Sequence, residues 1–194
     1  MRSAWLGPIL GAWIAAVAVG GLSLWRYAAA PGAPGAPPAT WPADAALHRT
    51  PGLATIVMLA HPHCPCTRAS VAELAELLRS VDGRAEAHVL FTRPDDEGDD
   101  WAHTDLYRAA EDVPGAHVHV DPGGREAHRF GAETSGQTAV YDPSGKLVFA
   151  GGITGVRGHE GDNAGLRRAR DVLTEGRADR DTSLVFGCPL QDPQ

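Results

Sequence analysis

The sequence predicts an α/β domain behind an N-terminal apolar helix. Three observations support this prediction. Residues 1–27 contain an uncharged run long enough to cross a bilayer. The rest of the chain alternates short β-branched apolar runs with segments of helical periodicity. A turn rich in cysteine and histidine, HPHCPCT at residues 61–67, joins the first such strand to the first such helix.

The composition fits one globular domain with appendages. The chain has 194 residues, of which 43% are hydrophobic, and this is enough for one buried core. The formal net charge is −7, and no segment concentrates lysine or arginine. Because nucleic acids attract basic surfaces, no nucleic-acid partner is expected.

The uncharged run at residues 4–25 is about the length of a transmembrane helix and has tryptophans near both ends. We therefore expect a membrane anchor within residues 1–27. A cleaved signal peptide is the alternative. Its apolar core would be unusually long, and the small-x-small site at residues 28–30 is followed by Pro31, which disfavours cleavage. The sequence thus favours an uncleaved, single-pass anchor.

Residues 28–45 form a linker rich in proline, alanine and glycine. Prolines favour an extended polyproline II chain that rises about 3.1 Å per residue. Over residues 28–40 this rise gives a spacer of roughly 40 Å. We expect the spacer to hold the domain of residues 46–194 clear of the bilayer.

Within the domain, strand and helix patterns alternate. Strands are expected at residues 55–60, 86–92 and 116–121, followed by a hairpin at 137–152 that turns at 142–145. Helices are expected at residues 67–80, 125–132 and 162–173, and a further helix is expected after the acidic loop that begins at residue 95. Asp99 or Asp100 would cap the second helix, and Asp162 or Asn163 the last.

The segment Cys64-Pro65-Cys66 carries the strongest chemical signal. Proline favours the first helical position, which would make Cys64 the N-cap and place Cys66 in the first turn. Both sulfurs would then lie near the positive end of the helix, which lowers a cysteine pKa. A disulfide between them would close a small, strained ring, and strained disulfides are easily reduced. A buried pair of small apolar residues is the plainer alternative.

The order of elements and the cysteine turn resemble the thioredoxin-like and peroxiredoxin-like superfamily over residues 55–173. The tract SGQTAVYDPSGKLVFAGGITGVRGHEGDN and the ending FGCPL are also similar to a group labelled RedB. The resemblance implies a central mixed sheet flanked by helices, and a thiol-disulfide oxidoreductase with Cys64 as nucleophile and Cys66 as resolving thiol. Two features depart from the family. The usual CxxC is shortened to CPC, and Gln137 stands where a cis-proline is usual.

Three further residues complete the expected redox site. In this fold the end of the hairpin lies beside the cysteine turn, which would bring Arg157 near Cys64. Gln137 and Arg157 are therefore the expected substrate-binding residues. Cys188 makes the number of cysteines odd. It is either a resolving partner that folds back to the turn or an apolar contact of the tail.

Copper binding is the alternative chemistry, because thiolates and imidazoles both suit Cu(I). The candidate ligands are His61, His63, Cys64, Cys66 and His159. Thioredoxin-like copper chaperones of the Sco type use two cysteines and a distant histidine, and His159 would be that histidine. His117 and His119 alternate along one strand face, and for them a solvated face is favoured over a metal site.

The sequence therefore predicts a bacterial membrane protein whose domain faces the periplasm. Its expected partners are protein thiols or disulfides, or a separate redox protein. The oxidoreductase needs no cofactor, and Cu(I) would be bound only under the alternative. The sequence leaves the substrate and the direction of electron transfer open.

Overall fold

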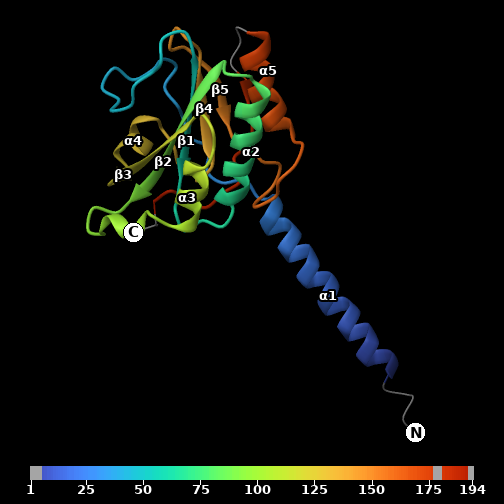
Figure 1. The fold of residues 1–194 in the computed structure, drawn as a ribbon. Helices are drawn as coiled ribbons and strands as arrows, with labels where there is room; N and C mark the ends of the chain where they lie inside the picture. The colour runs from blue at the N-terminus through green and yellow to red at the C-terminus, as the bar shows by residue number, and fades with distance from the viewer. Residues whose placement is uncertain (1–5, 177–180, 192–194) are drawn as a thin grey trace.

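The structure is a computed structural model that describes residues 6–176 and 181–191. In this part of the chain, a six-stranded mixed sheet forms the centre of the protein (Figure 1). The strand order is β3-β2-β1-β4-β5-β6. The strands are β1 Ala54–Ala60, β2 Ala85–Arg93, β3 Ala116–Pro122, β4 Gln137–Tyr141, β5 Leu147–Gly151 and β6 Asp181–Thr182. β2 is parallel to β1 and β3, β4 is antiparallel to β1 and β5, and β6 is parallel to β5.

Helices cover both faces of this sheet. They are α2 Thr67–Ser80, α3 Asp105–Glu111, α4 Arg125–Arg129 and α5 Ala164–Glu175, with a 3₁₀ turn η1 at Asp99–Trp101. This is the thioredoxin-like arrangement that the resemblance implied, so the predicted fold class is confirmed. In Figure 1, α2 and α5 lie on one side of the sheet and α4 on the other.

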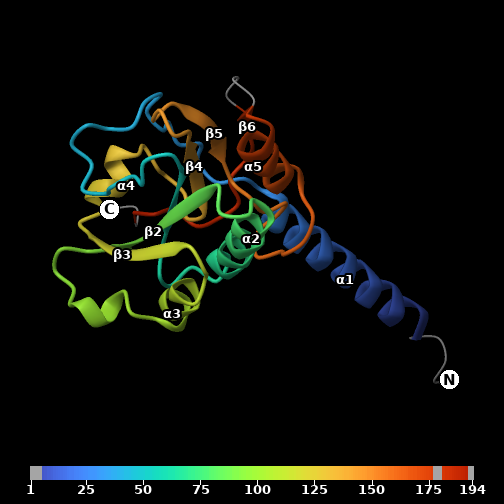
Figure 2. The ribbon, with the colours of Figure 1, turned by 45° about the horizontal axis from the view of Figure 1, so that its top comes forward.

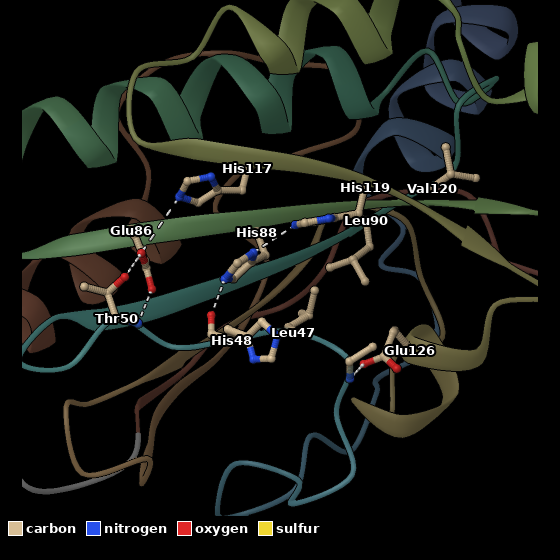
Figure 3. A pocket seen from close by; sticks show the side chains of 11 residues that line it. Leu47, His48, Thr50, Glu86, His88, Leu90, His117, His119, Val120 and Glu126 are labelled. Carbon is tan, nitrogen blue, oxygen red and sulfur yellow. Dashed lines mark hydrogen bonds and ion pairs between the residues drawn. The ribbon is translucent and has the colours of Figure 1, made fainter.

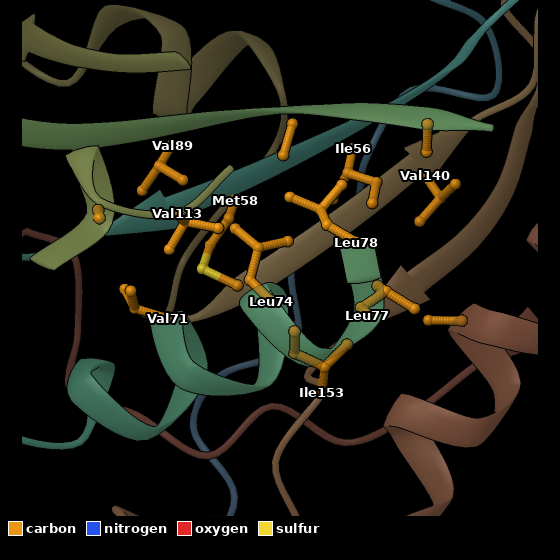
Figure 4. Close-up of a cluster of buried hydrophobic side chains, with 14 of the residues drawn as sticks. Ile56, Met58, Val71, Leu74, Leu77, Leu78, Val89, Val113, Val140 and Ile153 are labelled. Atoms are coloured by element: carbon orange, nitrogen blue, oxygen red, sulfur yellow. The ribbon is translucent and has the colours of Figure 1, made fainter. Parts of the chain in front are cut away.

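The central strand β1 is buried along its whole length, because it has layers packed on both faces. On one face Ile56 and Met58 pack with Leu74 of α2 in the larger of two hydrophobic clusters (Figure 4). On the other face Leu59 packs in a second cluster that includes Phe130. The continuous apolar run TIVMLA, which predicted a buried strand, thus reflects burial from two sides.

Two helix caps test the sequence expectations. Asn163 caps α5, and its side chain accepts a hydrogen bond from the Leu166 N–H at 2.9 Å, as one of the two expected caps. The expected Asp99 or Asp100 cap was wrong, because these residues form η1 and α3 begins after Thr104. The Thr104 hydroxyl accepts from the Tyr107 N–H, which is the usual role of an N-cap.

Helix α1 (Leu6–Ala29) is long and apolar enough to cross a membrane, with a mean hydropathy of 1.7 and no buried residue. Figures 1 and 2 show it leaving the domain next to α2. A signal sequence near the N-terminus can also be apolar and long enough to meet these criteria. Residues 1–5 of the expected anchor lie outside the described residues.

The segment between α1 and the sheet differs from the free spacer that its composition predicted. The Ala36 N–H donates to the Gly131 carbonyl at 2.8 Å, and the Leu147 N–H donates to the Ala39 carbonyl at 2.9 Å. Proline-rich chains leave their carbonyl groups free, and here the domain uses them as acceptors. The segment therefore lies along the domain and does not separate it from α1 by the expected distance.

Candidate functional site

Three cysteines meet where β1 gives way to α2. The sulfur atoms of Cys64, Cys66 and Cys188 all lie within 4.8 Å of one another. Cys64 is 2% exposed and Cys66 9%, while Cys188 is half-buried, and all three are free thiols. The tail cysteine therefore lies against the cysteine turn.

A close packing of the tail against the loop before β4 brings Cys188 to this place. The Ser135 N–H donates to the Cys188 carbonyl at 2.8 Å, and the Leu190 N–H donates to the Glu133 carbonyl at 3.0 Å. Gly187 permits the approach, because a Cβ atom there would lie 1.9 Å from the Ser135 carbonyl oxygen. These contacts join residues far apart in the chain, so sequence spacing did not reveal them.

The start of α2 differs from the expected one. The helix begins at Thr67 with Cys66 as its N-cap, so the prediction that Cys64 is the cap was wrong by two residues. A tight turn comes first, in which the Thr67 N–H donates to the Cys64 carbonyl at 3.1 Å. Pro65 lies inside this turn. Both sulfurs remain at the N-terminal end of the helix, where its dipole favours negative charge.

The three thiols have different acidities. Burial raises the pKa of Cys64, but hydrogen bonds from the Cys188 thiol, the Thr67 hydroxyl and nearby backbone outweigh it and hold this pKa below the ordinary value. Burial and the negative charge of Cys64 raise the pKa of Cys66. Burial, together with the hydrogen bond to Cys64, raises the pKa of Cys188 to about 12. Cys64 is therefore the thiol that ionises first.

Two hydroxyl groups that the sequence analysis did not assign to the redox site support the Cys64 thiolate. The Thr67 and Ser135 hydroxyl oxygens lie 2.6 Å apart, and the Ser135 oxygen also accepts from the His61 N–H at 2.8 Å. If the Ser135 hydroxyl donates to Thr67, the Thr67 proton is directed at Cys64. The position of Thr67, directly after the second cysteine, was the only sequence signal for this chain of hydroxyls.

The two expected substrate-binding residues have different environments. Gln137 is 2% exposed, and its side-chain amide donates to the Gly131 carbonyl and accepts from the Glu133 N–H. It holds the loop before β4 and is not open to a substrate. Arg157 is half-buried near the cysteines, and its charge lowers the pKa of both Cys66 and Cys188.

Arg157 also connects the site to the end of α1. Its backbone N–H donates to the Ala28 carbonyl at 3.0 Å, its side-chain Nε–H donates to the Ala30 carbonyl at 3.2 Å, and its guanidinium lies 5.1 Å from the centre of the Tyr27 ring. The same guanidinium donates to the Gly187 carbonyl, next to Cys188. One side chain therefore contacts both the end of the apolar helix and the tail segment that supplies the third cysteine.

The histidines expected as copper ligands lie outside the cysteine cluster. The rings of His61 and His63 pack edge-on against Trp101, with ring centres 5.3 and 4.6 Å from it. His159 is exposed. Among the described residues, the three cysteines alone form a group whose ligand atoms are this close together. Of the five expected ligands, the cluster contains Cys64 and Cys66, and Cys188 joins them.

A shallow cavity of about 310 Å³ opens beside Cys64. Its walls come from the cysteine turn and from the start of α3, including Pro65 and Thr104. The Arg68–Asp105 ion pair lies at its rim. Of the three cysteines, Cys64 is the one that lines this cavity.

The sequence matches no family model and no curated protein. Two solved structures have the same fold. An uncharacterized conserved protein from Geobacillus kaustophilus has a TM-score of 0.58 and 19% identity, over 85% of this chain and 93% of that one. A hypothetical protein from Sinorhizobium meliloti 1021 has a TM-score of 0.58 and 18% identity, over 83% of this chain and 93% of that one.

A secreted disulfide oxidoreductase from Mycobacterium tuberculosis aligns less closely, with a TM-score of 0.46 and 12% identity, over 64% of this chain and 83% of that one. At these identities the comparisons concern the fold. The chain is an α/β protein of thioredoxin-like fold that gathers three cysteines at the N-terminal end of α2.

Proposed function

We propose that the protein is a membrane-anchored thiol-disulfide oxidoreductase with Cys64 as its nucleophile. The observation that carries this proposal is the cluster of three sulfurs within 4.8 Å, of which only Cys64 has a lowered pKa. A thiolate is the reactive species in disulfide exchange, and a neighbouring thiol completes the reaction. Cys64 also borders the cavity through which a substrate sulfur would approach.

The reaction needs no group beyond the three cysteines and a substrate disulfide. The Cys64 thiolate attacks one substrate sulfur and forms a mixed disulfide, while the second substrate sulfur leaves as a thiolate and takes a proton from water. A second cysteine then gives up its proton, and its thiolate attacks the Cys64 sulfur. This forms an internal disulfide and releases the first substrate sulfur as a thiolate, which takes up that proton. The substrate thus gains two electrons from the protein and two protons, one from water and one from the thiol of the second cysteine. The reverse sequence oxidises a dithiol.

We assign the second attack to Cys188, whereas the sequence pointed to Cys66. The Cys188 thiol lies within 4.8 Å of the Cys64 sulfur, and as a hydrogen-bond donor it lowers the pKa of Cys64. When Cys64 enters the mixed disulfide its charge disappears, and one cause of the high Cys188 pKa disappears with it. The positive charge of Arg157 then favours the Cys188 thiolate. A Cys64–Cys66 bond would close a far smaller ring.

The contact between Arg157 and the end of α1 supports a position of the site near the membrane. If α1 spans the bilayer, Tyr27 lies at the interface and the cysteine cluster lies close to the bilayer surface. We therefore propose protein thiols near the membrane as substrates, with the domain in the oxidising periplasm. Carbonate washing of membranes tests the anchor. A soluble mature chain that begins near Pro31 would contradict it.

Trapping of the mixed disulfide tests the proposed reaction. Full-length protein in detergent is incubated with oxidised glutathione, and adducts are measured by mass spectrometry. Cys64→Ser should abolish exchange, Cys188→Ser should accumulate glutathione on Cys64, and Cys66→Ser should still turn over. Leu184→Ala, an exposed change in the same tail, is the matched control.

Two results contradict this scheme in different ways. Accumulation of the adduct in Cys66→Ser but not in Cys188→Ser would transfer the resolving role to Cys66. Absence of exchange in the unmodified protein would refute the oxidoreductase itself.

The cluster also supports copper binding as a second candidate function. Three thiolates form a soft donor set suited to Cu(I). Each cysteine-to-serine change should then weaken Cu(I) binding against a chelator by a decade or more. His159→Ala should leave it unchanged, because His159 lies outside the cluster. Equal Cu(I) affinity in the protein and in a variant without cysteines would rule this function out.

A further inference from the structure

A second polar site lies on the opposite side of the sheet, away from the cysteines. It is a cavity of about 380 Å³ above the parallel pair β2 and β3 (Figure 3). The residues that define its polar floor are Glu86 and His88 on β2 and His117 and His119 on β3. They share one face because alternate residues of a strand point the same way, and the parallel register sets His88 beside His117. The expectation of a plain solvated face for His117 and His119 was therefore incomplete.

His88 is held in a defined orientation. It is 6% exposed, and its Nε2 atom lies 2.9 Å from the carbonyl oxygen of His48. Because a carbonyl only accepts, Nε2 carries the proton. The Nδ1 atom of the neutral ring then carries a lone pair, which accepts a hydrogen bond from Nε2–H of His119 at 3.0 Å. A backbone carbonyl that fixes the tautomer of a histidine is the usual support of a metal ligand.

The charges around the cavity favour a cation. Glu86 is buried, and although burial raises its pKa, hydrogen bonds from the Thr50 hydroxyl and N–H lower it below the ordinary value. It is therefore a carboxylate. Burial also lowers the pKa of His88 and of His119, which favours the neutral form of both rings.

We propose that His88, His119 and His117 form a binding site for a divalent transition-metal ion of the zinc or copper(II) class. The 3.0 Å between His88 Nδ1 and His119 Nε2 is close to the roughly 3.3 Å that separates two nitrogens on a tetrahedral zinc with bonds of about 2.05 Å. On binding, the His119 proton moves from Nε2 to Nδ1. The exposed ring of His117, 5.4 Å from that of His88, turns to supply the third nitrogen.

Glu86 supplies the compensating charge. Its carboxylate lies 3.9 Å from His117 Nε2, and Thr50 holds it in place. Three nitrogens leave a fourth position for water, as in zinc sites that are open to ligands. The site is separate from the cysteine cluster, and its binding does not depend on the redox function proposed above.

Binding of Zn²⁺ to a cysteine-free protein tests this site. The full chain with Cys64→Ser, Cys66→Ser and Cys188→Ser is purified in detergent through a tag without histidine, and Zn²⁺ is titrated against a chromophoric chelator. One ion per chain is expected. Both His119→Ala and His117→Ala should weaken binding at least tenfold, and His88→Gln should do so more strongly. His128→Ala, at an exposed histidine outside the cavity, should have no effect.

A spectroscopic measurement separates ligand loss from misfolding. Cu²⁺ added to the same protein should give an electron paramagnetic resonance spectrum with splitting from three nitrogens, and the number should fall to two in His119→Ala. Full-strength Zn²⁺ binding by the His117→Ala/His119→Ala double variant would overturn the proposal. So would the absence of stoichiometric Zn²⁺ binding in the cysteine-free parent.

Discussion

Removal of the Cys188 thiol should raise the pKa of Cys64 by about one unit. Among the hydrogen bonds that lower the pKa of Cys64, the one from the Cys188 thiol has the largest effect. A hydrogen bond to a charged group contributes about 1.5–3 kcal/mol, and a thiol is a weak donor, so the lower end applies. Since one pKa unit corresponds to about 1.4 kcal/mol, Cys188→Ala shifts the titration by about one unit.

The rate of alkylation by iodoacetamide measures this shift, because only the thiolate reacts. The change is made in a Cys66→Ser background so that Cys64 is the one remaining cysteine. At a pH below both pKa values, the rate should fall about tenfold, in proportion to the thiolate fraction. Leu184→Ala, in the same tail and 62% exposed, should leave the rate unchanged. An equal or higher rate in Cys188→Ala would refute the hydrogen-bonding argument.

Two further predictions follow from named contacts. Thr67→Val removes the hydroxyl between Ser135 and Cys64, so the pKa of Cys64 should rise, by less than a unit, and alkylation at low pH should slow; an unchanged rate would count against this contact. Burial holds the pKa of His88 below its ordinary value of 6.5. On acidification, His88 in the unfolded chain therefore takes up a proton before His88 in the folded protein does. The stability of the folded protein thus falls as the pH drops from 6.5 towards the pKa of His88 in the folded protein. The melting temperature should therefore fall less between about pH 7.5 and 5.5 in His88→Gln than in the parent. An equal fall would show that Glu86, His117 or His119 carries the dependence.

Local features of the site could be predicted from the sequence. The apolar run of β1, the two cysteines after it and the helical periodicity of α2 are close in the chain, and together they predicted a reactive turn at the start of a helix. The helix start was misplaced, since a proline fits the tight turn before Thr67 as well as the first turn of a helix.

Features built from distant segments could not be predicted in this way. Cys188 reaches Cys64 because Gly187 packs against Ser135, and no local pattern encodes that approach. The histidine cavity depends on the register between β2 and β3, which places His88 beside His117. His88 itself lay within an apolar run that indicated only a strand.

The most direct test of the oxidoreductase is a redox titration of the full-length protein in buffers of reduced and oxidised glutathione, with free thiols counted by alkylation and mass spectrometry. The proposed reaction predicts that two thiols per chain disappear together as one two-electron couple, with a tenfold change in the ratio for about every 30 mV, and that Cys64→Ser abolishes this couple. Three thiols that remain reduced across the whole range, or a couple that persists in Cys64→Ser, would contradict it.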